Sequence, residues 1–185
     1  MRSRLHERAA AAALAALGLL ILALAGLPQR ADYTGQMVEG LGYTAPEPGA
    51  LAPRFMLPML DGTDFALANN LDRYVILNFW ATWCLPCEAE LPILQHVHMT
   101  YPQVIVLAVN VAEPAQHVGA WLAERQLSLP VALDLNSQIA RQYQLRGQPT
   151  TFIIAPGGVV RHVFHGPFSE QHLLATLFPE GLDSP

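Results

Sequence analysis

The sequence predicts an α/β fold, with strands and helices alternating around one central sheet. Two long apolar runs, 74–80 and 103–111, are too continuous for strands with one wet face, so they predict strands buried on both sides. After the first of them, apolar residues recur at intervals close to one helical turn. About 155 residues follow the first thirty, which is enough for one domain with a single core.

The elements predicted up to residue 100 are strands at 54–57, 63–67 and 74–80 and a helix from the cysteines to about residue 100. Asp61-Gly62 separates the first two strands, and this dipeptide is typical of tight hairpin turns. The helix follows from Leu91, Leu94 and Val97, which would share one of its faces. This half of the chain therefore predicts a hairpin, a central strand and a helix.

The second half of the chain continues the alternation. It predicts strands at 103–111, 131–134, 150–155 and 159–164, and helices at 116–125, 137–143 and 170–178. Pro114 opens the first of these helices, because proline is tolerated in a first turn. Ser137 and Ser169 are expected to cap the other two. The last two strands flank a Pro-Gly-Gly turn at 156–158, so we expect them to be antiparallel.

The first thirty residues are predicted to lie outside this domain. Three arginines precede an uncharged run at 9–27, whose nineteen residues come close to the length, about 20 residues, that spans a bilayer as a helix. We therefore predict a cytoplasmic N-terminus at 1–8, a transmembrane signal-anchor at 9–27, and export of the remaining chain. Cleavage after Ala25 is the alternative, because residues 23–25 have the small-x-small pattern of a signal-peptide site.

Residues 28–52 are rich in glycine and proline without periodicity, which predicts a linker, and 53–185 are predicted to form the domain. The expected location is the inner membrane, in a single pass, with the domain on the periplasmic or extracytoplasmic side. From Ala31 onward the chain carries fourteen acidic residues and six arginines, and it contains no lysine. Such an acidic domain is a poor candidate for nucleic-acid binding, and Schiff-base chemistry is excluded.

The chemistry of the chain is concentrated at Cys84 and Cys87, its only cysteines, which stand where a buried strand gives way to a helix. A disulfide across so short a loop restricts the unfolded chain little, and no second cysteine pair completes a zinc site. These residues therefore predict a reversible redox disulfide. Backbone N–H groups at the helix start favour the thiolate of Cys84, so we expect Cys84 to be the exposed nucleophile and Cys87 the shielded resolving thiol.

A second motif, Gln148-Pro149-Thr150, places a proline directly before a predicted strand. A tight turn with a cis bond would suit this position. Taken alone, however, the motif favours a trans proline in a loop, because most X–Pro bonds are trans.

Both motifs together resemble the thioredoxin superfamily, and more narrowly its membrane-tethered, exported TlpA/ResA-like branch. The matching segments are Asn78-Phe79-Trp80-Ala81-Thr82-Trp83-Cys84-Leu85-Pro86-Cys87, Glu90-Leu91-Pro92 and Gly147-Gln148-Pro149-Thr150-Thr151-Phe152. The resemblance extends from about Pro53 to the C-terminus. It implies a thioredoxin fold, a central mixed sheet flanked by helices, with an extra N-terminal β-hairpin and a cis Gln148–Pro149 bond beside the disulfide.

The resemblance also implies a thiol-disulfide oxidoreductase, for which we expect no cofactor. Members commonly reduce protein disulfides, several of them in cytochrome c maturation, and take electrons from an integral-membrane thiol donor. The substrate would be an exported, disulfide-containing protein, for example in cytochrome c maturation or metalloenzyme assembly. The residues expected to contact it are Trp83, Leu85, Pro86, Gln148, Pro149 and Thr150.

The chain departs from cytosolic thioredoxins at Asn78, where that family carries a buried, titratable aspartate. Glu90 stands where the tethered branch places an acidic residue, so the resemblance assigns it the proton-shuttling role that the resolving thiol of Cys87 requires. A surface glutamate near a helix start is the alternative for Glu90, because negative charge is favoured there.

Two other functions remain open at this point. One is a copper-binding or copper-delivery module of the same fold, and the other is an interaction subunit whose disulfide switches docking. The seven histidines form no i, i+4 pair on a predicted helix, so we predict no metal site. Leu85, between the cysteines, offers no polar or cationic group to stabilise a thiolate, and we therefore expect a reducing potential.

Overall fold

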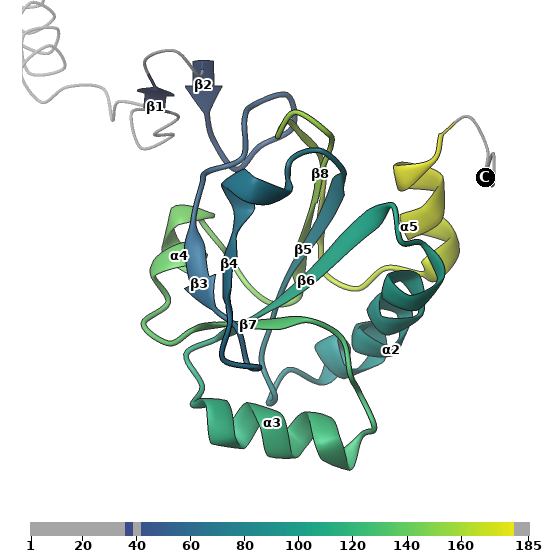
Figure 1. Ribbon diagram of the computed structural model, residues 1–185. Coiled ribbons are helices and arrows are strands. Elements are labelled where there is room, and N and C mark those ends of the chain that lie inside the picture. The colour runs from purple at the N-terminus through teal and green to yellow at the C-terminus, as the bar shows by residue number, and fades with distance from the viewer. Residues whose placement is uncertain (1–35, 39–41, 180–185) are drawn as a thin grey trace, which may run out of the picture. The chain divides into compact units, whose positions relative to one another are not determined.

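The computed structural model describes residues 36–38 and 42–179. A five-stranded sheet forms the centre of the domain (Figure 1). The sheet has the order β7-β6-β5-β8-β9. Its strands are β5 (Tyr74–Trp80), β6 (Val104–Val111), β7 (Val131–Asp134), β8 (Thr150–Ile154) and β9 (Val160–His165). The first three are parallel, whereas β8 and β9 are antiparallel to their neighbours. The predicted mixed sheet with an antiparallel final pair is confirmed.

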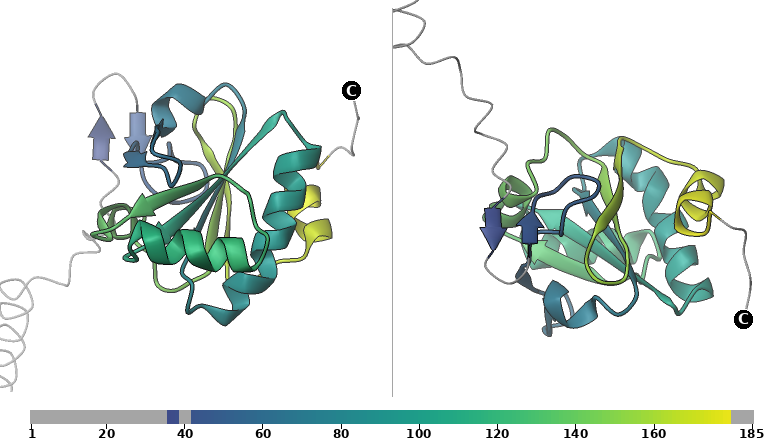
Figure 2. Two further views of the ribbon diagram at one scale, coloured as in Figure 1. Left: turned by 60° about the horizontal axis from the view of Figure 1, so that its bottom comes forward. Right: turned by 90° about the horizontal axis from the view of Figure 1, so that it is seen from above.

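Helices cover both faces of this sheet, because alternate residues of each strand point to opposite sides. The helices are α2 (Leu85–Thr100), α3 (Ala115–Glu124), α4 (Gln138–Gln142) and α5 (Glu170–Leu177). On β5, Ile76 and Trp80 enter a core shared with α2, α3 and α5. Leu77 and Phe79 enter a second core shared with α4. In both figures of the whole domain, α2 and α5 lie side by side (Figures 1 and 2).

The predicted N-terminal hairpin is present as β3 (Met56–Pro58) and β4 (Asp64–Ala66), followed by the 3-10 helix η2 (Leu67–Asn70). The side chain of Asp61 accepts hydrogen bonds from the backbone and hydroxyl of Thr63, which closes the turn. The hairpin is hydrogen-bonded to the edge strand β7, because Leu60 in its turn donates its N–H to the carbonyl of Val131 over 2.8 Å. The hairpin therefore protects one edge of the sheet.

Part of the predicted linker, 28–52, packs on the domain. A small hairpin forms from β1 (Gln36–Val38) and β2 (Gly42–Thr44). Beyond it, the N–H groups of Gly49 and Ala52 donate to the carbonyls of Val160 and Gly158, each over 2.8 Å. The sequence pattern did not predict this attachment. It is made by backbone groups, which every residue carries, and their partners lie more than a hundred residues away in the chain.

Of the two predicted serine caps, one is confirmed and one is wrong. At the start of α5, Ser169 accepts a hydrogen bond from the N–H of His172 over 3.2 Å. Ser137 precedes α4, but its backbone is left-handed (φ 55°) and its side chain makes no cap hydrogen bond. Asn136 and Asp134 accept from the first N–H groups instead, because the left-handed turn brings their side chains to the helix start.

The predicted cytoplasmic segment, 1–8, and the predicted anchor, 9–27, lie outside the described residues. Within the described part of the chain, no helix combines the length and the apolar character needed to cross a membrane.

Candidate active site

The two cysteines form a disulfide at the start of α2, directly after the carboxyl end of β5. Their Cα atoms lie 5.3 Å apart. Cys84 occupies the N-cap position of the helix, and its carbonyl accepts from the N–H groups of Cys87 and Glu88. The predicted placement of Cys84 at a helix N-terminus is confirmed, and the positive end of the helix dipole there favours a thiolate. Pro86 lies in the first turn, as expected.

In the oxidised state, both sulfur-bearing residues are shielded. Cys84 is 4% exposed and Cys87 is 1% exposed, so the expectation that Cys84 is openly exposed is wrong for this state. The disulfide packs into the core that α2 shares with the sheet, which explains its burial. The exposed surface is supplied by the flanking side chains, Trp83 (74%) and Leu85 (79%). These two large apolar groups form a rim beside the disulfide.

Glu90 lies one turn beyond Cys87 on α2, and it is buried, with 1% of its surface exposed. Residues three apart share a helix face, so the carboxyl group is on the side of the resolving thiol. Burial raises the pKa of Glu90 to about 7, although hydrogen bonds from the Phe168 N–H and the Asn78 amide partly oppose this. The alternative of a surface glutamate is therefore wrong for Glu90.

Asn78 connects Glu90 to the sheet. Its side-chain Nδ2 donates to Glu90 Oε2 over 3.1 Å and to the hydroxyl of Thr151 over 2.8 Å. Phe168 donates its N–H to the other carboxylate oxygen over 3.1 Å. The Oδ1 atom of Asn78 is buried and has no hydrogen-bond partner. The amide thus faces the charged form of Glu90 with its donor side.

The loop before β8 carries the other predicted contact residues. The Gln148–Pro149 bond is cis, as the resemblance implied. Gln148 is half-buried, and its side-chain amide lies 3.4 Å from the carbonyl of Trp80 at the end of β5. Pro149 is buried, and its carbonyl accepts from the N–H of Gly166. Thr150 is also buried and donates its hydroxyl to Gly147, so its side chain is not part of the exposed rim.

Comparison with known proteins identifies the family. The model of the AhpC/TSA family matches residues 48–163, more than half of the chain. The chain belongs to this family of thioredoxin-like proteins. Thiol-disulfide oxidoreductase ResA of Geobacillus thermodenitrificans is 33% identical over 157 residues, which cover 84% of this chain and 87% of the relative. The ResA protein of Bacillus subtilis is 33% identical over 156 residues, 83% of this chain and 85% of the relative.

Solved structures agree with the thioredoxin-like fold. A crystal structure assigned to the thiol:disulfide interchange protein DsbE of Chlorobium tepidum matches with a TM-score of 0.65 at 32% identity, covering 71% of this chain and 98% of that one. StoA of Bacillus subtilis matches with a TM-score of 0.60 at 26% identity, covering 67% and 96%. The predicted family, fold and oxidoreductase class are confirmed.

Besides Glu90, the side chains of Glu113 and Asp134 are buried in this thioredoxin-like domain, and the sequence pattern singled out neither. Glu113 follows β6, is 8% exposed, and bonds to Thr82 in the loop that leads to the cysteines. His117 lies four residues further on and faces the same pair. The i, i+4 spacing of Glu113 and His117 was the available signal. It was not informative alone, because only the pairing of β5 with β6 places Thr82 beside it.

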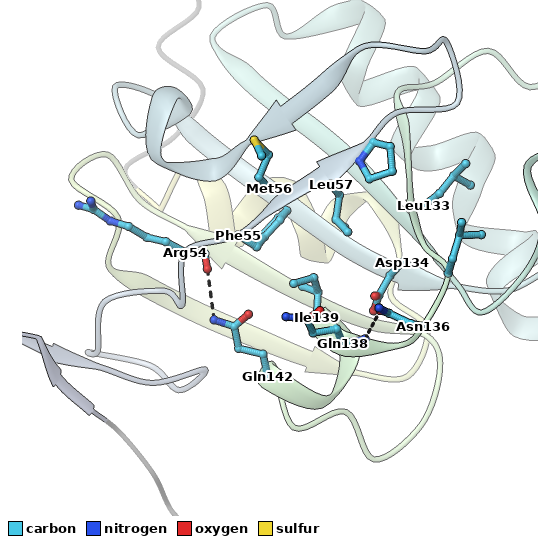
Figure 3. Close-up of a pocket in the computed structure, with 12 residues that line it drawn as sticks. Arg54, Phe55, Met56, Leu57, Leu133, Asp134, Asn136, Gln138, Ile139 and Gln142 are labelled. Carbon is cyan, nitrogen blue, oxygen red and sulfur yellow. Dashed lines mark hydrogen bonds between the residues drawn. The ribbon is translucent and has the colours of Figure 1, made fainter.

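A separate pocket of about 620 Å³ lies between β3 and the segment that joins β7 to α4 (Figure 3). Apolar side chains such as Leu57 and Ile139 line it, with the side chain of Gln142 bonded to the backbone of Arg54. None of the predicted site residues lines this pocket. Within the described ranges, no group of three or more His, Cys, Asp or Glu side chains is placed to hold a metal ion.

Proposed function

We propose that this oxidoreductase works as a reductant of disulfides in exported proteins, using Cys84 as nucleophile, Cys87 as resolving thiol and Glu90 as proton acceptor. The arrangement that carries the proposal is the disulfide at the start of α2 with a buried carboxyl group one turn behind it. The relatives named thiol-disulfide oxidoreductase ResA support the same chemistry.

In the reduced protein, the thiolate of Cys84 attacks one sulfur of the substrate disulfide. A mixed disulfide forms, and the other substrate sulfur leaves as a thiolate. Cys87 must then lose its proton in order to attack the Cys84 sulfur. A carboxylate with a pKa of about 7 is well matched to accept that proton. The Cys84–Cys87 bond forms, the second substrate thiol is released, and two electrons have passed to the substrate.

The rim is suited to a protein substrate. Trp83 and Leu85 offer exposed apolar surface on both sides of Cys84 in the chain, and Pro86 is exposed beside them. A disulfide in an extended or unfolded segment could be placed against such a rim, with the adjacent apolar side chains of the substrate covering it. Substrate contact by Gln148 and Pro149 belongs to the same proposal, since the resemblance places their loop beside the disulfide.

We further propose that residues 9–27 hold the domain at the outer face of the inner membrane. The uncharged run and the three arginines before it support this topology. Tethering raises the effective concentration of Cys84 near an integral-membrane thiol donor. Membrane fractionation tests the proposal: the mature protein should remain with membranes, and a soluble form with a new N-terminus near Gly26 would contradict it.

From the resemblance we propose that the substrate is an exported, disulfide-containing protein of cytochrome c maturation or of metalloenzyme assembly. A trapping experiment can identify this protein. Cys87→Ser should stop the reaction at the mixed disulfide and leave the substrate attached to Cys84. Isolation of these adducts from membranes of the native host would identify the substrate. Multiple turnover of a protein disulfide would contradict the alternative of a docking switch. Stoichiometric copper in the purified protein would favour the metal-binding alternative.

A further inference from the structure

Residues 81–84 connect β5 to α2 and are called the redox loop here. A second polar cluster, which does not include Glu90, contacts this loop and consists of Thr82, Asn110, Glu113 and His117. Glu113 accepts hydrogen bonds from the N–H of Thr82 over 2.8 Å, from the hydroxyl of Thr82, and from Nδ2 of Asn110 over 2.7 Å. A buried carboxylate is costly unless donors replace the water that it has lost, and this one has three. Removal of any donor would leave part of the charge unsatisfied. The cluster therefore holds Thr82 firmly.

The sheet explains why these residues meet. β5 and β6 are adjacent and parallel, with Trp80 paired to Asn110, so their carboxyl ends lie at the same edge. The loop from β5 to the cysteines and the loop from β6 to α3 are consequently neighbours. Ala112 adopts a left-handed conformation, with φ 64°, directly before Glu113. This conformation is unfavourable for alanine and persists only where the surroundings require it.

His117 completes the cluster from the solvent side. Its Nε2 atom lies 2.9 Å from the Thr82 hydroxyl and 3.7 Å from Oε1 of Glu113. A hydroxyl group has one proton, and Thr82 donates it to Glu113. The contact with His117 is therefore satisfied only when Nε2 carries a proton and donates. Hydrogen bonds then run in one direction, from His117 through Thr82 to Glu113.

Thr82 is separated from Cys84 by a single residue, the exposed Trp83. Within this turn, Cys84 donates its N–H to the carbonyl of Ala81 over 3.2 Å. The side chain and backbone of Thr82 are thus the anchor of a short loop whose far end is the nucleophile. Displacement of that anchor would move Cys84 relative to the N-terminus of α2, where the helix dipole stabilises its thiolate.

We propose that Glu113 is a positioning residue for the redox loop: acting through Thr82, it holds Cys84 at the helix N-terminus in the orientation that favours the thiolate. The inference rests on the proposed function, because Cys84 is taken as the nucleophile. It adds Glu113, Thr82 and His117 to the residues that determine how reactive that nucleophile is.

The decisive variants are Thr82→Val, which keeps the shape but removes the hydroxyl, and Thr82→Ser, which restores it. The measurement is the rate of alkylation of Cys84 by iodoacetamide in the reduced protein, across a pH series, with Cys87 changed to serine in every sample. We expect Thr82→Val to move the midpoint of the profile to higher pH and to slow alkylation at pH 7 by about tenfold. Thr82→Ser should retain most of the original rate.

Asp134→Asn provides a matched control for loss of folding stability. Asp134 is also buried, and its side chain accepts from the N–H of Ala140 at the start of α4. Its backbone carbonyl accepts from the N–H of Ala112, and the change to Asn leaves that carbonyl in place. Urea unfolding should report a loss of stability for this variant with an unchanged alkylation profile. Glu113→Gln combined with Thr82→Val should alter the profile less than the sum of the two single changes, because both act through one contact.

An unchanged alkylation profile in Thr82→Val would overturn the proposal, whatever happens to stability. A profile that moves equally in Asp134→Asn would also overturn it, since the effect would then be one of general stability. Turnover of a protein disulfide by the unaltered protein is measured separately. Its absence would contradict the proposed function, whereas the alkylation series would still decide whether Glu113 positions Cys84.

Discussion

The side-chain amide of Asn78 on β5 donates to the carboxylate of Glu90 on α2 over 3.1 Å, and both residues are buried. A neutral group therefore supports the buried acid. It supplies a hydrogen bond to the charged form without adding a second charge that would compete for the proton. Because Asn78 Oδ1 has no partner, the same amide could turn and accept from the protonated acid.

Glu90→Gln should make the stability of the domain less dependent on pH. The folded protein raises the pKa of Glu90 from 4.5 to about 7, so folding favours the protonated form. The contribution of the protonated Glu90 carboxyl to the free energy of unfolding is fully present below pH 4.5 and is lost as the pH rises through 7. Glutamine cannot ionise, so the variant does not lose this contribution. Its free energy of unfolding, relative to that of the unaltered protein, should therefore rise by about 2–3 kcal/mol between pH 4.5 and pH 8. Urea unfolding at several pH values measures this difference.

The difference between the two proteins is the informative quantity, because His162 also contributes to the pH dependence. Burial, with His172 and His165 nearby, lowers the pKa of His162, so its contribution is lost as the pH falls. Parallel stability curves for Glu90→Gln and the unaltered protein would contradict the raised pKa.

The same substitution should slow the second half of the reaction. Without a proton acceptor, the Cys87 thiol ionises less readily. The rate at which Cys87 resolves the mixed disulfide should therefore fall by about 100-fold. Rapid-mixing kinetics with a disulfide substrate would separate this step from the first attack, which should change much less. Equal slowing of both steps would mean that Glu90 does not act on Cys87.

Asn78→Asp should be tolerated at low pH and destabilising at high pH. Two buried carboxyl groups within hydrogen-bond distance cannot both ionise without strong repulsion, so they would share a proton. We expect a loss of several kcal/mol at pH 8 and a much smaller loss at pH 5, measured by urea unfolding. A loss of equal size at both pH values would indicate a packing defect instead of charge repulsion.

The potential of the Cys84–Cys87 couple should be nearer that of thioredoxin, about −270 mV, than that of a strong oxidant, about −120 mV. The uncharged Leu85 between the cysteines supplies no group that would stabilise the thiolate and so favour the dithiol form. Equilibration against a series of glutathione ratios measures the potential. A value above about −180 mV would contradict a reductant role.

The two serines before α4 and α5 provide a matched pair for stability. Ser169→Ala removes the hydroxyl that accepts from His172, and it should destabilise the domain by about 1 kcal/mol. Ser137→Ala removes no cap and should change stability by less than about 0.5 kcal/mol, because the position is a surface turn. Thermal and urea unfolding of both variants would test the assignment, and an equal loss in both would contradict it.

The sequence by itself determined the elements and the redox pair. The strand at 74–80, the helix that follows it and the hairpin around Asp61-Gly62 depend on apolar periodicity and turn residues, which are local properties. The prediction of a redox pair at the helix start depends only on the spacing of the two cysteines along the chain. Resemblance to a family then provided the cis proline bond and directed attention to Glu90.

The tertiary structure decided which polar groups meet, because hydrogen bonds between distant segments leave no periodic signal. Only the parallel pairing of β5 with β6 brings Thr82 to Glu113, thirty-one residues away. Only the packing of α2 on the sheet buries Glu90 against Asn78 and so raises its pKa. Burial of Cys84 in the oxidised state has the same origin, since its exposure depends on what the folded chain places around it.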